Sequence, residues 1–339
     1  MAVWLGFILL VVLMLALDLG VFNRRSHVIS TREALRWTSL WVSVSLLFSV
    51  FVFFAYDRAW FGIGEEVGHP SRGIDAALTF LTGYIVELSL SMDNIFVIAV
   101  IFSYFGIPKQ YQHRVLFWGI LGAVIFRGLF IAAGAYLVAH FDWVLYVFGA
   151  ILLWTAYKML KSNSDEEIHP DDNILLRFFR KFLPVTKQMR GDHFFVKRNN
   201  RIVAMTPMFV ALIVVETTDV MFAFDSIPAI FAITSDPFLV FTSNIFAILG
   251  LRSMYFVLAS LLDKFEYLKY SLAAILAFVG IKMVALHPLH IKLEQWVSLT
   301  LIVTLLAAGI IASLLKERAD KRKEEKKSDE HSPKTTEVM

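Results

Sequence analysis

Six acidic residues lie within long apolar stretches of this sequence: Asp18, Glu87, Asp93, Glu216, Asp219 and Asp225. An ionised side chain at the centre of a bilayer costs at least about 3 kcal/mol on insertion scales, so such residues are rare unless they have a use. Structural ion pairs with Arg127, Arg252 and Lys282 could neutralise three of these acids, which leaves three others. Protonation would turn those into proton carriers, whereas a bound divalent cation would neutralise several acids at once.

The spacing of the acids decides which of them could share one ion. Glu216 and Asp219 lie three residues apart and share a helix face. Glu87 and Asp93 lie six apart, about 9 Å along a straight helix and not on one face. They converge only if the helix bends or unwinds between them. In the second stretch Pro228 could cause such a break, because it cannot donate to the carbonyl four residues earlier, and a freed carbonyl is a ligand for hard cations. In the first stretch, which has no proline, we infer unwinding by symmetry.

The side chains beside the acids narrow the choice of ion. Oxygen donors accompany the acids at Asn94, Thr217, Thr218 and Ser226, and oxygen ligands suit Mg²⁺, Ca²⁺ or Mn²⁺. The chain has no cysteine, and its nine histidines fall in loops or at predicted helix ends, which serves zinc, copper and haem poorly. Met92 and Met221 flank the acids and could add a soft ligand that favours Mn²⁺, although methionine at such positions more often serves packing.

The apolar stretches predict an all-α integral membrane protein. Hydrophobic residues make up 58% of the 339 positions and charged residues 18%, with a mean hydropathy of +0.65. Blocks of about 18 or more apolar residues are long enough to cross a bilayer. Nine such segments can be delimited: 2–22, 37–56, 76–104, 115–139, 143–160, 203–233, 238–262, 270–286 and 295–315. The first is expected to be a retained anchor, because its basic residues follow it.

The distribution of basic residues predicts the orientation. If the nine segments alternate across the membrane, 26 of the 32 Lys and Arg residues fall on one side and three on the other, with three inside spans. Cytoplasmic loops are enriched in Lys and Arg, so the N-terminus is expected outside and the C-terminus in the cytoplasm.

A membrane domain of residues 1–318 is expected, with a cytoplasmic loop at 161–202. A disordered cytoplasmic tail is expected at 319–339. Within the loop, residues 174–183 have the pattern of an amphipathic helix on the membrane surface. Residues 193–204 have the pattern of a small β-hairpin, with an irregular linker as the equal alternative.

Two three-helix units, at about 76–160 and 203–286, resemble one another. Glu87 and Asp93 match Asp219 and Asp225 at a displacement of 132 positions, and Arg127 matches Arg252 at 125. A unit with an odd number of helices must run inverted in its second copy, and inverted repeats place a shared substrate site near the bilayer midplane. The alternative is a duplication retained only for packing.

The stretches ELSLSMDNIFV (87–97), ETTDVMFAFDSIPAIFAITSDPF (216–238) and TSNIFAILGLRSMYF (242–256) resemble the TerC/Alx family of bacterial membrane proteins, which is related to the LysE-type transporters. The resemblance covers essentially the whole chain. It implies a multi-pass protein of the bacterial inner membrane, associated with manganese export and with tellurium resistance. The family's acids fall on Glu87, Asp93, Glu216, Asp219 and Asp225, with Asn94 beside them. Met92 and Met221 are not fixed parts of the pattern.

Together these features predict a non-enzymatic exporter of Mn²⁺, with the metal as substrate and no permanent cofactor. Its candidate ligands are Glu87, Asp93, Asn94, Glu216, Asp219 and Asp225, with Asp18, Ser226, Met92, Met221, Arg127 and Arg252 in auxiliary roles. Protons are the expected counter-ion, and no ATP-binding Walker motif is present. The expected partners are the bilayer, a divalent cation and a second copy of the chain. Nucleic acid is not an expected partner. One alternative is a metal sensor or scaffold. Another is an intramembrane hydrolase, but the chain lacks the HExxH motif and has no buried His beside a Ser.

The charge count can be tested with reporter fusions. Fusions at Gly64 and Thr234 should report an external location, and fusions at Asn163 and Ser328 a cytoplasmic one. An internal signal at Gly64 would contradict both the nine-span topology and the inverted repeat.

Overall fold

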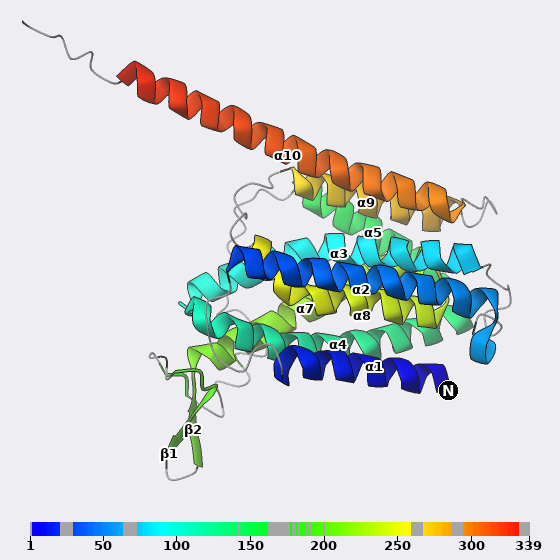
Figure 1. The fold of residues 1–339 in the computed structure, drawn as a ribbon, viewed down its shortest axis with the longest axis horizontal. Helices are drawn as coiled ribbons and strands as arrows, with labels where there is room; N and C mark the ends of the chain where they lie inside the picture. Colours follow the sequence, from blue (N-terminus) through cyan, green and yellow to red (C-terminus); the bar gives the residue numbers. More distant parts are fainter. Residues whose placement is uncertain are drawn as a thin grey trace, which may run out of the picture.

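The computed structural model of the chain describes residues 2–20, 30–63, 73–141, 143–161, 177, 181, 184–186, 189, 191–198, 201–258, 267–286 and 294–331. These residues form a bundle of long α-helices with one small β-hairpin at its end (Figure 1). The predicted all-α membrane architecture is confirmed, because eight of the described helices are long and apolar enough to cross a membrane.

The helices follow the predicted spans closely. They are α1 (Ala2–Gly20), α2 (Thr31–Asp57), α3 (Gly73–Tyr104), α4 (Lys109–His140), α5 (Trp143–Lys161), α7 (Pro207–Phe231), α8 (Pro237–Leu258), α9 (Leu268–Ile281) and α10 (Gln295–His331). A short 3₁₀ turn, η1 (Trp60–Gly62), follows α2, and a π-helical turn, η4 (Lys282–Leu286), extends α9. α1 is not among the eight, and its apolar stretch is Val3–Ala16.

Four helices form the centre of the bundle. α3 packs against α7 and α8, and α4 packs against the same two helices from the other side. In α8, 83% of the most apolar 18-residue window is buried, against 22% in α5 and in α10. Polar side chains carried by α8 are therefore shielded from lipid, whereas α5 and α10 present much of their surface to it. α10 lies along one edge of the bundle on α9 and α3, and α1 lies at the opposite edge (Figure 1).

Small residues let the helices approach one another closely. Helices in lipid depend on such close packing, because moving apolar surface from lipid to another helix contributes little free energy. At the contact between α5 and α9, a Cβ added to Gly149 would lie 2.6 Å from Val284 and 3.0 Å from Met283. A Cβ added to Gly280 would lie 3.1 Å from the carbonyl oxygen of Gly149. Both positions thus require glycine at this helix spacing.

A buried acid outside the six predicted ones anchors the start of α8. One carboxylate oxygen of Asp236 accepts from the backbone N–H groups of Phe238 at 2.9 Å and Leu239 at 3.3 Å. The other oxygen accepts from the Tyr56 hydroxyl of α2 at 2.7 Å. Asp236 is therefore a helix cap that also joins α2 to α8. It lies between two predicted spans, so the search for acids within spans did not include it.

The regions outside the spans give mixed outcomes. The predicted hairpin is confirmed: β1 (Phe195–Arg198) pairs antiparallel with β2 (Arg201–Met205). The amphipathic helix predicted at 174–183 lies outside the described residues, except for Arg177 and Lys181. Disorder was predicted from residue 319, but α10 continues as a helix to His331. Lys, Arg and Glu make up eight of these thirteen residues and favour helix, and a helix already formed extends without the cost of nucleation.

The packing has the pattern that an inverted repeat requires. Exchanging α3 with α7, α4 with α8 and α5 with α9 converts the contact between α3 and α8 into the one between α4 and α7. It also leaves the contacts α3–α7, α4–α8 and α5–α9 in place. The repeat itself remains a prediction.

The close contact between α5 and α9 yields a stability test. Gly149→Ala should lower the thermal unfolding midpoint of the purified protein in detergent, because its Cβ has no room beside Met283 and Val284. The expected cost is about 1–3 kcal/mol, larger than the gain of about 1 kcal/mol in helix propensity. Gly250→Ala is the control, since a Cβ there meets only Trp41 at 3.7 Å. Equal midpoints for the two variants would contradict the packing.

Candidate functional site

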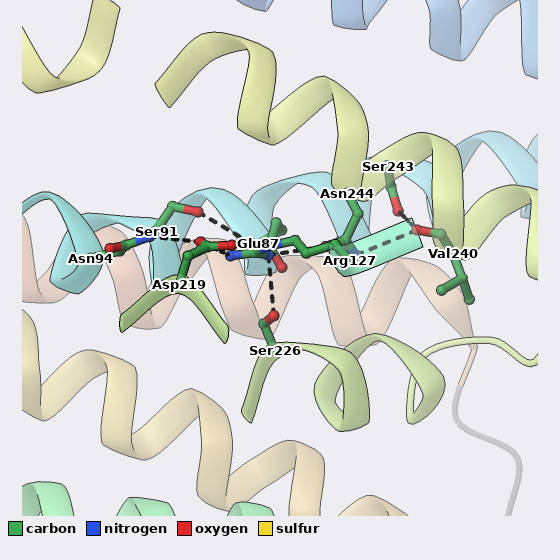
Figure 2. Close-up of polar contacts among 9 residues, drawn as sticks. All are labelled: Glu87, Ser91, Asn94, Arg127, Asp219, Ser226, Val240, Ser243 and Asn244. Carbon is green, nitrogen blue, oxygen red and sulfur yellow. Dashed lines mark hydrogen bonds and ion pairs between the residues drawn. The ribbon is translucent and has the colours of Figure 1, made fainter. Parts of the chain in front are cut away.

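A buried arginine is the centre of the polar groups inside the bundle. Arg127 lies on α4 with 1% of its surface exposed. Its Nη1 atom forms an ion pair with Glu87 Oε1 of α3, and its Nη2 atom lies 3.1 Å from Asp219 Oδ1 of α7. Figure 2 shows the guanidinium between these two carboxylates. Glu87 and Asp219 are the two acids that the predicted repeat matches to each other.

Neutral side chains complete the shell around this guanidinium. Arg127 Nη1 also donates to Ser226 Oγ of α7 and to Asn244 Oδ1 of α8, both at 3.2 Å. Arg127 Nε lies 3.5 Å from Asp219 Oδ2. One arginine side chain therefore contacts polar groups from α3, α7 and α8, and each of its three nitrogens has at least one acceptor.

A second set of hydrogen bonds orients the carboxylates. Asn94 Nδ2 donates to Asp219 Oδ1 at 2.9 Å, and Ser91 Oγ donates to Glu87 Oε1 at 3.3 Å (Figure 2). Glu87, Ser91 and Asn94 follow one another at intervals of four and three residues on α3, so they share one face of that helix. Asp219 and Ser226 are seven residues apart and share a face of α7 in the same way. The local sequence therefore places each of these groups on the helix face that carries the Arg127 cluster.

Three buried oxygen atoms in this region have no hydrogen-bond partner among the residues that the structure describes. They are Glu87 Oε2, Asn94 Oδ1 and Glu216 Oε2. A buried acceptor without a donor or cation is costly, so each such atom in a native structure requires an explanation. All three are the hard oxygen ligands that Mg²⁺, Ca²⁺ and Mn²⁺ prefer.

Glu216 lies one helical turn before Asp219, and its carboxyl group rests on α4. A Cβ added to Gly122 would lie 2.0 Å from Glu216 Oε1, so only glycine leaves room for this carboxylate. The charge of Asp219 acts on Glu216, which makes the two a like-charged pair on one face of α7. The hydroxyls of Thr217 and Thr218 bond to carbonyls of their own helix, at Ile213 and Val215, and are not directed at this pair.

The structure does not bring all six predicted acids together. Asp225 accepts from Thr155 Oγ1 of α5 at 2.7 Å and interacts electrostatically with Lys158, away from Arg127. Asp93 is only partly buried, and no hydrogen bond joins it to the Arg127 cluster in the described part of the chain. Among the described residues, no three Asp, Glu or His side chains are placed to hold one metal ion.

The predicted unwinding between paired acids is wrong in both copies. α3 is α-helical throughout Gly73–Tyr104, so Glu87 and Asp93 stay on different faces. α7 is α-helical through Pro228 and ends three residues later at Phe231. A proline this close to the end of a helix removes one hydrogen bond without requiring the chain to unwind.

The auxiliary residues have different locations. Ser226 and Arg127 belong to the cluster, and Arg252 is buried on α8 about two turns beyond Asn244. The Met221 side chain is 65% exposed, which directs it away from the buried acids, and Met92 is partly exposed. Asp18 lies on α1, and its side chain is outside the described residues.

The comparisons with known proteins agree with the sequence motifs. A family model described as "Integral membrane protein TerC family" matches residues 72–321. The chain belongs to the TerC family. The matched region holds every residue of the Arg127 cluster, whereas α1 and α2 precede it. The site therefore lies within the matched region, and the first two helices precede it.

The relatives cover nearly the whole chain. An uncharacterized membrane protein of Myxococcus xanthus is 50% identical over 93% of this chain and 92% of its own length. A protein of Escherichia coli named "Putative membrane-bound redox modulator Alx" is 44% identical over 94% of this chain and 97% of its own. An uncharacterized membrane protein of Rickettsia bellii is 40% identical over 92% and 97%, respectively. No solved structure matches the chain significantly.

The sequence analysis did not identify Asn244 and Ser91. Both are uncharged residues within apolar spans, and neither stands out by type from other Ser and Asn residues of the chain. The signal available was position: Ser91 shares the face of Glu87 and Asn94, and Asn244 follows Thr242 and Ser243 in a predominantly apolar helix.

The charge balance around Arg127 can be tested by removing it. Arg127→Met strands two buried carboxylates and should destabilise the protein by about 3–5 kcal/mol, which lowers its yield and unfolding midpoint in detergent. Combining it with Asp219→Asn should recover part of that loss, because one stranded charge is then gone. Arg36→Met, at an exposed position of α2, is the control. If the double variant is no more stable than Arg127→Met, the arginine acts through its packing and not its charge.

Proposed function

We propose that this TerC protein is a secondary exporter of divalent cations, with Mn²⁺ as substrate, and that the acids around Arg127 form its cation site. The observation that carries the proposal is the excess of negative charge in the core. Glu87 and Asp219 pair with Arg127, and Glu216 interacts with Asp219, so these three acids and one base carry a formal charge of −2 when all three acids are ionised. One divalent cation balances that charge.

The unpartnered oxygens support the same proposal. Glu87 Oε2, Asn94 Oδ1 and Glu216 Oε2 have acceptor capacity that no donor in the described part of the chain uses. Together with Asp219, they would offer a cation oxygen ligands from α3 and α7, the two helices that correspond in the predicted repeat. The donor set fits Mg²⁺, Ca²⁺ and Mn²⁺ alike. The choice of Mn²⁺ rests on the resemblance to a family associated with manganese export.

In this proposal Arg127 acts as an internal counter-ion. Without a bound cation, its guanidinium neutralises Glu87 and Asp219, which would otherwise repel each other inside a low-dielectric bundle. A divalent cation that binds these acids repels the guanidinium, so Arg127 must shift toward the neutral acceptors Ser226 and Asn244. Binding of the substrate is thereby linked to a rearrangement of α4 against α7 and α8, as alternating access requires.

The energy source is proposed to be a gradient of ions, with protons as the counter-ion. A carboxylate released by the metal can take up a proton, which prevents an unpaired charge from crossing the bilayer. The protein is proposed to lie in the bacterial inner membrane with its N-terminus outside, because 26 Lys and Arg residues fall on the side assigned to the cytoplasm.

A metal sensor or scaffold that does not transport is the second candidate. The basic loop between α5 and α7, which carries the hairpin, favours it as a surface for partners. The relative's description as a redox modulator also refers to a regulatory role. Thiol–disulfide chemistry cannot be the basis in this chain, because it has no cysteine. Transport by the purified protein alone distinguishes the two candidates.

The first test is Mn²⁺ flux into proteoliposomes that contain only this protein. Glu216→Gln keeps the size of the side chain, removes one charge and breaks no ion pair of Arg127. We expect the concentration of Mn²⁺ for half-maximal flux to rise about 10- to 100-fold, the cost of losing a supporting group at a metal site. Asp75→Asn, at an exposed position in the first turn of α3, should behave like the parent. A parent protein without flux, or unchanged flux in Glu216→Gln, would contradict the proposed site.

The second test concerns the counter-ion. With a pH-sensitive dye inside the vesicles, Mn²⁺ entry should change the internal pH in proportion to the metal moved, because each cation exchanges with protons on the carboxylates. An imposed pH gradient should drive Mn²⁺ against its own gradient. Flux that ignores the imposed gradient would leave a facilitator or a different coupling ion.

A further inference from the structure

A cavity of about 400 Å³ lies outside the Arg127 cluster, at the edge of the bundle. It is formed by α1, the second half of α2, the turn around η1 and the start of α8. Its lining is Val3, Gly6, Phe7, Leu10, Phe48, Phe51, Trp60, Ile63 and Phe238. The first residues of α1 and the turn after α2 lie at the same end of the bundle (Figure 1). The proposed function makes no use of this cavity.

The lining selects an apolar occupant. Of its nine residues, only Trp60 has a side-chain hydrogen-bond donor, and none is charged. A ligand with several polar groups would therefore lose its hydrogen bonds to water on entering the cavity and would find no replacements there. A hydrocarbon chain loses nothing of this kind, and the surrounding bilayer supplies such chains at high concentration.

The depth of the cavity matches one leaflet. Its deepest residue on α2, Phe48, lies nine residues before the last residue of the helix, Asp57, which corresponds to about 14 Å. Half of a hydrocarbon core about 30 Å thick is about 15 Å. The cavity thus follows α2 from the membrane surface to about the bilayer midplane, as an acyl chain of one leaflet does.

Trp60 of the cavity lining and Arg58, two residues before it in the chain, are groups suited to a lipid headgroup. Arg58 ends α2, is exposed, and its guanidinium lies 5.5 Å from the centre of the Phe54 ring. Trp60, 37% exposed, follows it and packs on Phe51 with 6.0 Å between ring centres. Tryptophan and arginine at the end of a membrane helix are typical of the interface, and a guanidinium binds phosphate well.

From this geometry we propose a phospholipid-binding site in which one acyl chain occupies the cavity and the headgroup phosphate binds Arg58. The acyl chain lies against the lining residues Phe7 of α1 and Phe51 of α2. It completes the packing of α1, whose rings Trp4 and Phe7 meet Phe238 of α8 at 5.5 and 5.9 Å between ring centres. The site is a specific one, because its walls belong to three helices and not to a single lipid-facing surface.

Gly6→Phe tests the acyl chain. Gly6 lines the cavity, and a Cβ built there has nothing within 4 Å, so the phenylalanine ring can enter the space without displacing a neighbour. The full-length protein, purified in detergent, is titrated with dioleoyl phosphatidylglycerol, and bound lipid is counted by native mass spectrometry. The parent should bind one lipid at least tenfold more tightly than Gly6→Phe. Leu9→Phe, at a 69% exposed position of α1 outside the cavity, is the matched control and should bind like the parent.

Arg58→Gln tests the phosphate. It should weaken binding of phosphatidylglycerol several-fold and leave binding of dioleoylglycerol, which has the same chains and no phosphate, unchanged. If the parent binds dioleoylglycerol as tightly as the phospholipid, the headgroup part of the proposal is wrong. If Gly6→Phe binds phosphatidylglycerol like the parent, or if the parent retains a different apolar molecule there, the lipid site is overturned.

A second readout does not depend on the folding of Gly6→Phe. Phospholipid brominated midway along its acyl chains should quench the fluorescence of Trp60 at about one lipid per protein. The Trp60 signal is the difference between the parent and Trp60→Phe. The absence of quenching at that ratio would also overturn the site. Neither measurement involves metal transport, so the outcome is independent of the proposed function.

Discussion

The ion pair of one guanidinium with two carboxylates, enclosed where neither water nor lipid reaches, constrains the whole centre of this bundle. Charges in such surroundings must be compensated at close range, because the cost of leaving one unpaired is several kcal/mol. Arg127 reaches from α4 to Glu87, Asp219 and Asn244, one on each of three other helices. Any rotation or sliding of these helices that breaks a contact exposes a charge. The cluster therefore fixes the register of four helices that apolar packing alone would leave poorly defined in lipid.

The same cluster carries more negative than positive charge, which links the architecture to its use. A purely structural ion pair is best balanced by equal numbers of acids and bases, and the orphaned oxygens of Glu87 and Glu216 serve no packing purpose. Gly122 supports this view, because it creates room for the Glu216 carboxylate at a place where any side chain would exclude it. A core that keeps an extra acid, and makes space for it, is suited to a transient cation.

The sequence was sufficient for the fold and for part of the site, and the division has a physical cause. Hydropathy and charge asymmetry predict spans because the bilayer imposes both. The helix ends match the predicted segments to within six residues, except at the extended end of α10. Intramembrane acids stand out for the same reason. Helical periodicity relates residues on one helix only, so it could pair Glu216 with Asp219 but not join Glu87 to Asp219 across two helices. Nor could periodicity show that Asp225 lies outside the Arg127 cluster, where it accepts a hydrogen bond from Thr155 of α5.

α8 connects the Arg127 cluster to the apolar cavity. Asp236 caps its first turn and binds Tyr56 of α2, Phe238 forms a wall of the apolar cavity, and Asn244 contacts Arg127. Phe238 and Asn244 are six residues apart, about 9 Å along one continuous helix. A buried helix moves as a rigid body over such a distance. A cation that changes the contact between Arg127 and Asn244 would therefore shift the cavity wall with it. By the reciprocity of linked equilibria, a lipid that prefers one position of that wall must also change the affinity for the cation.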